Sequence, residues 1–158
     1  MADLRELLEG HGYQDVRTHL QSGNVVLSSA LASRKLEAQL ERHLSAGLGM
    51  DVRVLVRTRA ELAQVVRRDP LGKVATNGSR YLVSFLSKRL PAKAARELEA
   101  AEIAPSQLVI DGPEIYAWYP DGVQRAPIAK LLADERLGVV STARNWNTVT
   151  KLLELLDD

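Results

Sequence analysis

The chain contains no cysteine, and aromatic residues make up only 4% of its 158 positions. The absence of cysteine excludes a disulfide framework, a thiolate metal site and a cysteine nucleophile. No run of apolar residues approaches the ~20 that a membrane-spanning helix needs, and the chain opens on a polar helical pattern rather than on a signal peptide. These absences predict a soluble cytoplasmic protein that has no membrane partner.

An excess of charge of one sign is also lacking, because 21 Lys and Arg residues face 20 Asp and Glu residues. A formal net charge of +1 argues against bulk electrostatic capture of nucleic acid or of an anionic membrane. Hydrophobic residues make up 46% of the chain, and a chain of this length forms one domain or two small halves that share an interface. Composition thus indicates a globular protein without indicating its function.

The first half of the chain reads as helix, strand, strand, helix and strand. Leucines at helical spacing predict a helix over 2–10, and extended apolar runs on either side of a polar turn predict a β-hairpin within 15–29. Leucines at every fourth position predict a helix over 33–47 that ends at glycine. The valines of 51–57 alternate with other residues, and this alternation predicts a strand.

A loop without periodicity follows this half. Thr58 and Glu61 match a capping box, in which each side chain binds the other residue's backbone amide, and the helix that they open ends before Pro70. The loop itself carries an Asn-Gly turn pair, as expected of a linker. We therefore expect a first half with its connecting helix, a linker, and a second half with a C-terminal helix, over 1–70, 71–80 and 81–158.

The second half has the order strand, helix, strand, strand, helix, strand and a final helix. Its strands are predicted over 81–86, 107–111, 114–119 and 139–142, and its helices begin at Pro91, Pro127 and Asn145. The order up to the last strand is that of a ferredoxin-like unit with an antiparallel sheet. The first half has the same order without its first strand. The sequence therefore predicts an α+β fold of two tandem ferredoxin-like halves, the first lacking its first strand, plus a C-terminal helix.

Three separated motifs resemble a known family. They are DVRTHLQSGNVV (15–26), YPDG (119–122) and TARNWNTV (142–149), and they occur in this order. On these motifs the chain is similar, over about residues 2–156, to the domain of unknown function 1697 family of bacterial proteins. The resemblance implies a cytoplasmic α+β protein built from two ferredoxin-like parts. It implies no established activity.

The chain departs from the family pattern at two places. Members of the family begin with a further strand and a Gly-rich basic loop before the helix that starts here at Ala2. They also tend to carry Arg-Ser-Lys-Leu where this chain has Arg125-Ala126-Pro127-Ile128, so a hydroxyl and an ammonium group are absent. The second departure argues against a catalytic or phosphate-binding role for this stretch.

The first departure predicts an open sheet in the first half. The first strand of a ferredoxin-like sheet lies in its centre, so its absence leaves 52–56 without a partner and exposes a hydrogen-bonding edge of 24–28. Unpaired buried backbone groups cost ~1–3 kcal/mol each. Self-association through the exposed sheet edge, closure of the gap within the chain, or a loosely ordered first half would each follow from this cost.

Polar residues at the start of the final helix form the first candidate site. A guanidinium beside free amides at a helix N-terminus would suit a phosphate or a carboxylate. The alternative is structural, with Asn145 as the helix cap and Trp146 in the core. The candidates in this group are Arg144, Asn145, Asn147 and Thr148.

Two turns supply further candidates. In the hairpin turn, Gln21, Ser22 and Asn24 offer amides and a hydroxyl to a ligand, although a tight turn also favours such residues for its own backbone. In the turn of the second half, Tyr119 and Asp121 form the third group.

The function favoured by these residues is binding of a small anionic ligand or partner without catalysis. One alternative is an enzyme acting on a small phosphate- or carboxylate-bearing substrate, with Asp121, Arg125 or Lys151 as acid or base. Another is a protein- or nucleic-acid-interaction module. Tyr116 and Trp118 could stack bases, but the RNP signature is absent and a packing role in the core or between the halves is favoured for them. The histidines lack metal-ligand spacing and no nucleotide-binding glycine motif occurs, so neither a metal nor a cofactor is expected.

Overall fold

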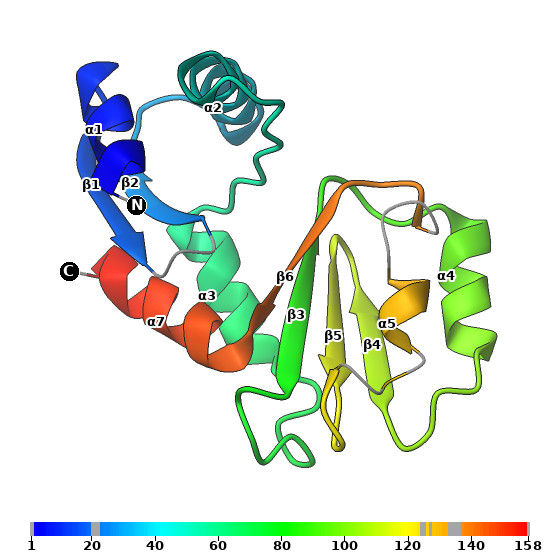
Figure 1. The fold of residues 1–158 in the computed structure, drawn as a ribbon. Helices are drawn as coiled ribbons and strands as arrows, with labels where there is room; N and C mark the ends of the chain where they lie inside the picture. Colours follow the sequence, from blue (N-terminus) through cyan, green and yellow to red (C-terminus); the bar gives the residue numbers. More distant parts are fainter. Residues whose placement is uncertain (1, 20–22, 124–125, 127, 133–136, 158) are drawn as a thin grey trace. The chain divides into compact units, whose positions relative to one another are not determined.

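The computed structural model describes residues 2–19, 23–123, 126, 128–132 and 137–157. These residues form helices and two antiparallel sheets, of two and four strands, which confirms the predicted α+β class. The chain forms two units (Figure 1): unit 1 is Met1–Leu62 with Lys151–Asp158, and unit 2 is Ala63–Thr150. The predicted domain boundaries, with a linker over 71–80, stay a prediction. No helix in the described part of the chain is long and apolar enough to cross a membrane.

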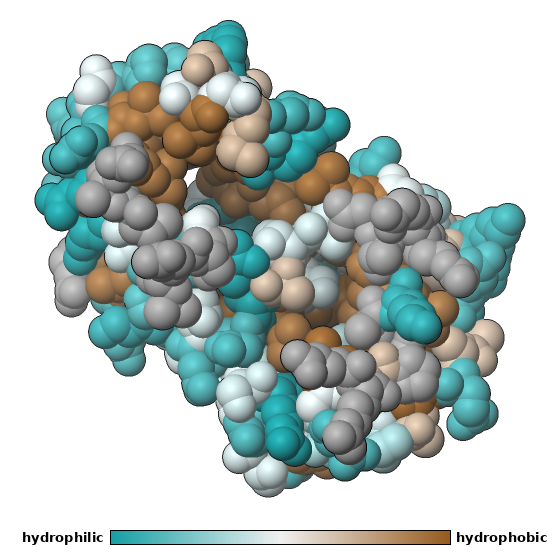
Figure 2. All heavy atoms as spheres, in the orientation of Figure 1, coloured by the Kyte–Doolittle hydropathy of each residue, from teal (hydrophilic) through white to brown (hydrophobic). Residues whose placement is uncertain are grey.

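Unit 1 contains helices packed on a β-hairpin, as the spacing of its leucines and valines predicted. Its first elements are α1 (Ala2–Gly10), β1 (Gln14–His19), β2 (Asn24–Ser28) and α2 (Ser33–Leu48). Figure 2 shows hydrophobic residues gathered over α1 and α2. The buried members of this cluster are Leu8, Val16, Leu36, Leu40 and Leu44.

The next helix, α3 (Arg59–Arg68), begins at the predicted capping box, and both hydrogen bonds of the box are present. The N–H of Thr58 donates to Glu61 Oε1 at 2.9 Å, and the N–H of Glu61 donates to Thr58 Oγ1 at 3.2 Å. These two bonds satisfy backbone amides that a helix N-terminus would otherwise leave unpaired.

The predicted strand over 51–57 is wrong, because none of these residues belongs to a strand. The alternation from which it was predicted is real, since Val52, Val54 and Val56 pack against the hydrophobic cluster of unit 1. A strand also requires a ladder of backbone hydrogen bonds to a second strand. The N–H groups of these valines donate instead to side chains of α2. Among the described residues, the sheet of unit 1 therefore has only the strands β1 and β2.

Unit 2 is built on a four-stranded antiparallel sheet with the strand order β4-β5-β3-β6. This order, with one helix after β3 and another after β5, is compatible with the predicted ferredoxin-like unit. The final helix follows β6. The elements are β3 (Tyr81–Leu86), α4 (Ala92–Ala100), β4 (Gln107–Asp111), β5 (Glu114–Trp118), α5 (Ile128–Leu131), β6 (Ser141–Asn145) and α7 (Trp146–Asp157).

The last strand of unit 2 is displaced from its predicted position over 139–142. Val139 is buried in a hydrophobic cluster with Leu86 and Leu98, which accounts for the apolar pattern at this position. It precedes the strand, which begins at Ser141. The ladder is formed by the more polar residues of β6, which is the edge strand of the sheet and pairs with β3.

Alternate residues of β3 face the two sides of the unit-2 sheet. Leu86 packs in one cluster with residues of α4 and α5, so these helices cover one side (Figure 1). On the other side, the hydroxyl of Tyr116 in β5 donates to the carbonyl of Val65 in α3 at 2.8 Å. The fully buried Val83 of β3 pairs with Tyr116, so both lie on this second side.

Candidate functional site

One end of the unit-2 sheet brings together residues that are far apart in the sequence. β3 begins at this end and β5 and β6 finish there, because Leu82 pairs with both Ala117 and Asn145. The turn that follows β5, with the candidates Tyr119 and Asp121, therefore lies at the same end as the candidates around Asn145. Two of the three predicted groups thus share one end of a sheet.

The start of α7 is capped as the sequence predicted. The N–H of Thr148 donates to Asn145 Oδ1 at 2.9 Å, and the N–H of Trp146 donates to the carbonyl of Gly78 at 3.0 Å. Two amides of the helix N-terminus are thus satisfied within unit 2. The capping interpretation of Asn145 is confirmed, and a ligand at this end would be held chiefly by side chains.

Arg144 is fixed just before α7 begins. Its Nη1 donates to Thr142 Oγ1 at 2.7 Å and to the carbonyl of Ala143 at 2.9 Å. Its side chain is partly buried, and this burial lowers the pKa of the guanidinium from its ordinary value. A guanidinium carries five N–H donors in a planar fork, which fits the oxygens of a carboxylate or a phosphate. Arg144 is therefore a pre-positioned cation at this end of the sheet.

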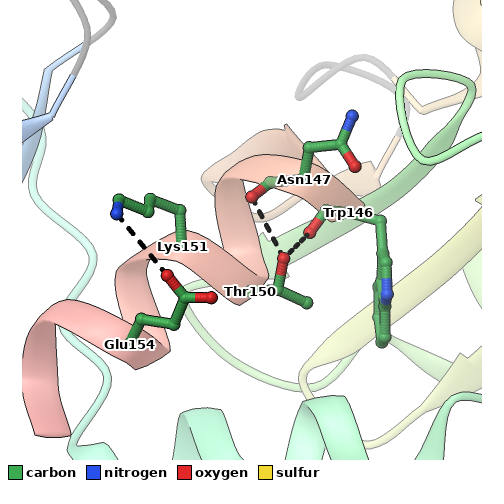
Figure 3. A network of polar contacts seen from close by, with 5 residues as sticks. All are labelled: Trp146, Asn147, Thr150, Lys151 and Glu154. Atoms are coloured by element: carbon green, nitrogen blue, oxygen red, sulfur yellow. Dashed lines mark hydrogen bonds and ion pairs between the residues drawn. The ribbon is translucent and has the colours of Figure 1, made fainter.

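Asn147 projects from the first turn of α7 and is exposed (Figure 3). The Thr150 hydroxyl in the same figure donates to the carbonyls of Trp146 and Asn147 at 3.0 and 3.1 Å. These hydrogen bonds lie within α7. A Cβ atom on Gly78 would overlap Asn147 Oδ1, so the loop before β3 lies against the carboxamide and a larger residue at position 78 would displace that side chain.

The loop before β3 is also joined to the turn after β5. Arg80 Nη1 donates to the carbonyl of Pro120 at 2.6 Å, and the N–H of Tyr119 donates to the carbonyl of Arg80 at 2.9 Å. The Tyr119 side chain is buried, and burial raises its pKa to about 12, so its hydroxyl stays neutral. Asp121 is exposed.

The aromatic residues of unit 2 form part of the core rather than a stacking surface. Tyr116 and Trp118 lie on one side of β5, as their spacing predicted, and both are buried. Tyr81 joins them, and its ring stacks on Trp146 with 4.7 Å between the ring centroids. Bases could not stack on rings that are already covered, so this arrangement argues against the nucleic-acid alternative.

The hairpin candidates belong to unit 1. Asn24 is buried, and its Nδ2 donates to the carbonyl of His19 at 3.0 Å, which closes the turn as a structural role requires. Gly23 has a φ of +84°, a conformation that favours glycine. Gln21 and Ser22 lie outside the described residues.

The described residues of the enzyme alternative belong to different units. Asp121 belongs to unit 2, whereas Lys151 belongs to unit 1 and lies 3.5 Å from the carboxylate of Glu154 on α7 (Figure 3). Arg125 lies outside the described residues. Within the described part of the chain, no three His, Cys, Asp or Glu side chains lie close enough together to hold a metal ion.

Gly78 and Arg80 were not among the predicted site residues. The sequence marked their loop as a turn, but their contacts with α7 and with the turn after β5 depend on which strands lie on either side of β3. Local spacing carries no signal for that pairing.

The fold occurs in a conserved bacterial protein, SP0830 from Streptococcus pneumoniae. That structure matches with a TM-score of 0.78 at 18% identity, over 100% of this chain and 89% of that chain. A likeness at this identity concerns the fold alone, and no curated protein matches the sequence. The family described as "Protein of unknown function (DUF1697)" matches residues 1–116, and the chain belongs to this family, as its motifs predicted.

Proposed function

We propose that the protein binds a small anionic ligand in the cytoplasm, at the end of the unit-2 sheet where α7 begins. The observation that carries this proposal is the guanidinium of Arg144, which is partly buried and held by Thr142 and Ala143. A cation that is fixed before the ligand arrives loses little conformational entropy on binding. Asn147 adds an exposed carboxamide on the next turn.

The ligand is expected to be compact and to carry a carboxylate or a phosphate. Charge-assisted hydrogen bonds to a guanidinium are about twice as strong as neutral ones. The helix amides offer less, because those of Trp146 and Thr148 already have acceptors. Asn145 supports the site by capping α7, and the turn with Tyr119 and Asp121 borders it.

A thermal-shift screen with inorganic phosphate, nucleoside phosphates and small carboxylates tests this function. A ligand present at 100 times its dissociation constant stabilises the folded state by about 2.7 kcal/mol. We expect this response in the wild type and in Arg34→Ala, which removes an exposed arginine of α2. We expect Arg144→Ala, compared with its own unliganded state, to lose it.

Asn145→Ala serves as the structural control for this screen. Loss of a helix cap costs about 1 kcal/mol, so this variant should unfold more easily yet still respond to the ligand. A screen without any response in the wild type, or a full response in Arg144→Ala, would contradict the proposed function.

Self-association through an exposed strand edge is a second candidate function. Among the described strands, β2 pairs only with β1, so its opposite edge carries no strand. β2 contains neither lysine nor proline, two residues that commonly protect open edges from pairing. Sedimentation velocity over two decades of protein concentration tests this function: a dimer at the upper end supports it, and a monomer throughout contradicts it.

A further inference from the structure

Residues 51–57 of unit 1 form an extended segment that has α2 along one side and a second open edge along the other. The N–H groups of alternate residues donate to side chains that stand four residues apart along the helix. The three bonds run from Val52 to Ser45 Oγ at 3.0 Å, from Val54 to Glu41 Oε1 at 3.3 Å and from Val56 to Glu37 Oε1 at 2.8 Å.

The spacing of these bonds shows that the segment is extended like a strand. Four residues of an α-helix rise ~6.0 Å, and two residues of a strand rise ~6.6–6.8 Å. A helix can therefore offer one acceptor to every second residue of a strand that runs alongside it. The side of 51–57 that faces α2 thus has its backbone donors satisfied without a neighbouring strand.

On the opposite side of the segment, the backbone of Arg53 and Leu55 has no such partner. In a strand, the residues between the valines turn their backbone groups the other way. The N–H groups of Arg53 and Leu55 have no acceptor among the described residues, and Arg53 is exposed. An edge of this kind is a template for pairing with an added strand.

The charges of the segment fit a second copy of the same segment. When two copies run antiparallel about a two-fold axis at Val54, Asp51 of each lies opposite Arg57 of the other. Arg53 then lies opposite Leu55, and the flanking valines lie opposite each other. Two opposite-charge pairs form for each dimer, and no like charges face each other.

Two other antiparallel registers would also direct the N–H groups of Arg53 and Leu55 toward the second copy. Both of these registers are disfavoured. An axis at Leu55 would place Arg53 opposite Arg57 twice, and an axis at Arg53 would place the two copies of Arg53 opposite each other. Like charges directly opposite each other on paired strands are destabilising. The charge pattern therefore selects the register centred on Val54.

We infer that residues 51–57 pair with the same residues of a second copy, antiparallel and centred on Val54, to form a symmetric dimer. This inference rests on the self-association proposed above and names its surface as 51–57 rather than β2. Pairing supplies acceptors for the N–H groups of Arg53 and Leu55. Arg57, whose Nη1 donates to the carbonyl of Val56, gains the carboxylate of Asp51 from the other copy.

Charge reversal tests the surface through the symmetry of the pair. Asp51→Arg or Arg57→Asp alone places like charges opposite each other twice in the dimer, so we expect each variant to dimerise at least about tenfold more weakly. Mixing the two variants should restore a dimer, because every pair in the mixed dimer has opposite charges. The double variant Asp51→Arg/Arg57→Asp should also dimerise, and Arg34→Asp is the matched charge control.

Sedimentation velocity of the full chain distinguishes the outcomes. A wild type that stays monomeric overturns self-association altogether. A wild-type dimer that both single variants retain overturns this surface and leaves β2 as the edge that pairs, or points to another occupant. Amide hydrogen exchange supplies a second readout: Arg53 and Leu55 should be protected in the dimer only, and a dimer in which both exchange freely contradicts the inference.

Discussion

The two units differ in how their extended segments satisfy the backbone. In unit 2, β3 has a strand on each side, and Val83 pairs with both Tyr116 and Arg144. In unit 1, the segment 51–57 has a helix on one side, and on the other side the N–H groups of Arg53 and Leu55 have no acceptor among the described residues. The comparison shows that an alternating apolar pattern specifies which residues face the core but does not specify what completes the backbone hydrogen bonds.

The same difference appears in the side chains that are buried. Unit 2 buries the hydroxyl-bearing residues Tyr81, Tyr116 and Tyr119, whereas Tyr13 of unit 1 is only partly buried. The hydroxyl of Tyr13 contacts Gln39 Oε1 at 2.8 Å on α2. Closed packing in unit 2 thus removes its tyrosines from water more completely.

The largest effect is expected at alkaline pH, which should destabilise unit 2 because its tyrosines are buried. Burial raises the pKa of Tyr116 and of Tyr119 to about 12, against about 10 in an unfolded chain. The folded state therefore binds more protons than the unfolded state between about pH 10 and pH 12, so stability falls as pH rises through that window. Each tyrosine contributes at most about 2–3 kcal/mol to the loss. Chemical unfolding from neutral to alkaline pH measures it.

Tyr119→Phe is the variant that isolates this effect. The structure records no side-chain hydrogen bond of Tyr119 among the described residues, so the change should leave stability at neutral pH within about 0.5 kcal/mol of the wild type. Above about pH 10 the variant should be more stable than the wild type. Equal stability of the two proteins across the alkaline range would mean that Tyr119 ionises as freely in the folded state as in the unfolded one.

A smaller effect is expected where the helix side chains replace a strand in unit 1. Glu37→Ala removes the acceptor of the Val56 N–H, and losing a hydrogen bond to a partly exposed carboxylate should cost about 1 kcal/mol. Glu37→Gln keeps an oxygen acceptor and should cost less. Urea unfolding of both variants measures the difference, and identical losses would show that the bond contributes nothing to stability.

Local patterns predicted the elements that depend on neighbouring residues. The capping box at Thr58 and Glu61 and the cap at Asn145 were predicted because each bond joins residues three positions apart. The sheet of unit 2 was predicted because its order of elements matches a known unit.

The remaining features depend on contacts that local spacing does not encode. The strand over 51–57 was wrong because its neighbour is a helix rather than a strand, although its alternation is real. For the candidate site, the sequence indicated Arg144 and Asn147 from their polarity at a helix start. The approach of Gly78 to α7 follows from the pairing of β3 with β6, over a separation of more than sixty residues.

Residue-resolved amide hydrogen exchange on dilute, monomeric protein tests the difference between the units most directly. The account predicts that the amides of β3, which lies between two strands, exchange slowest. In the segment 51–57 it predicts alternation, with Val52, Val54 and Val56 protected by α2 and with Arg53 and Leu55 exchanging rapidly. Uniform protection along the segment would show that a strand or another element covers its outer side, and would contradict the account.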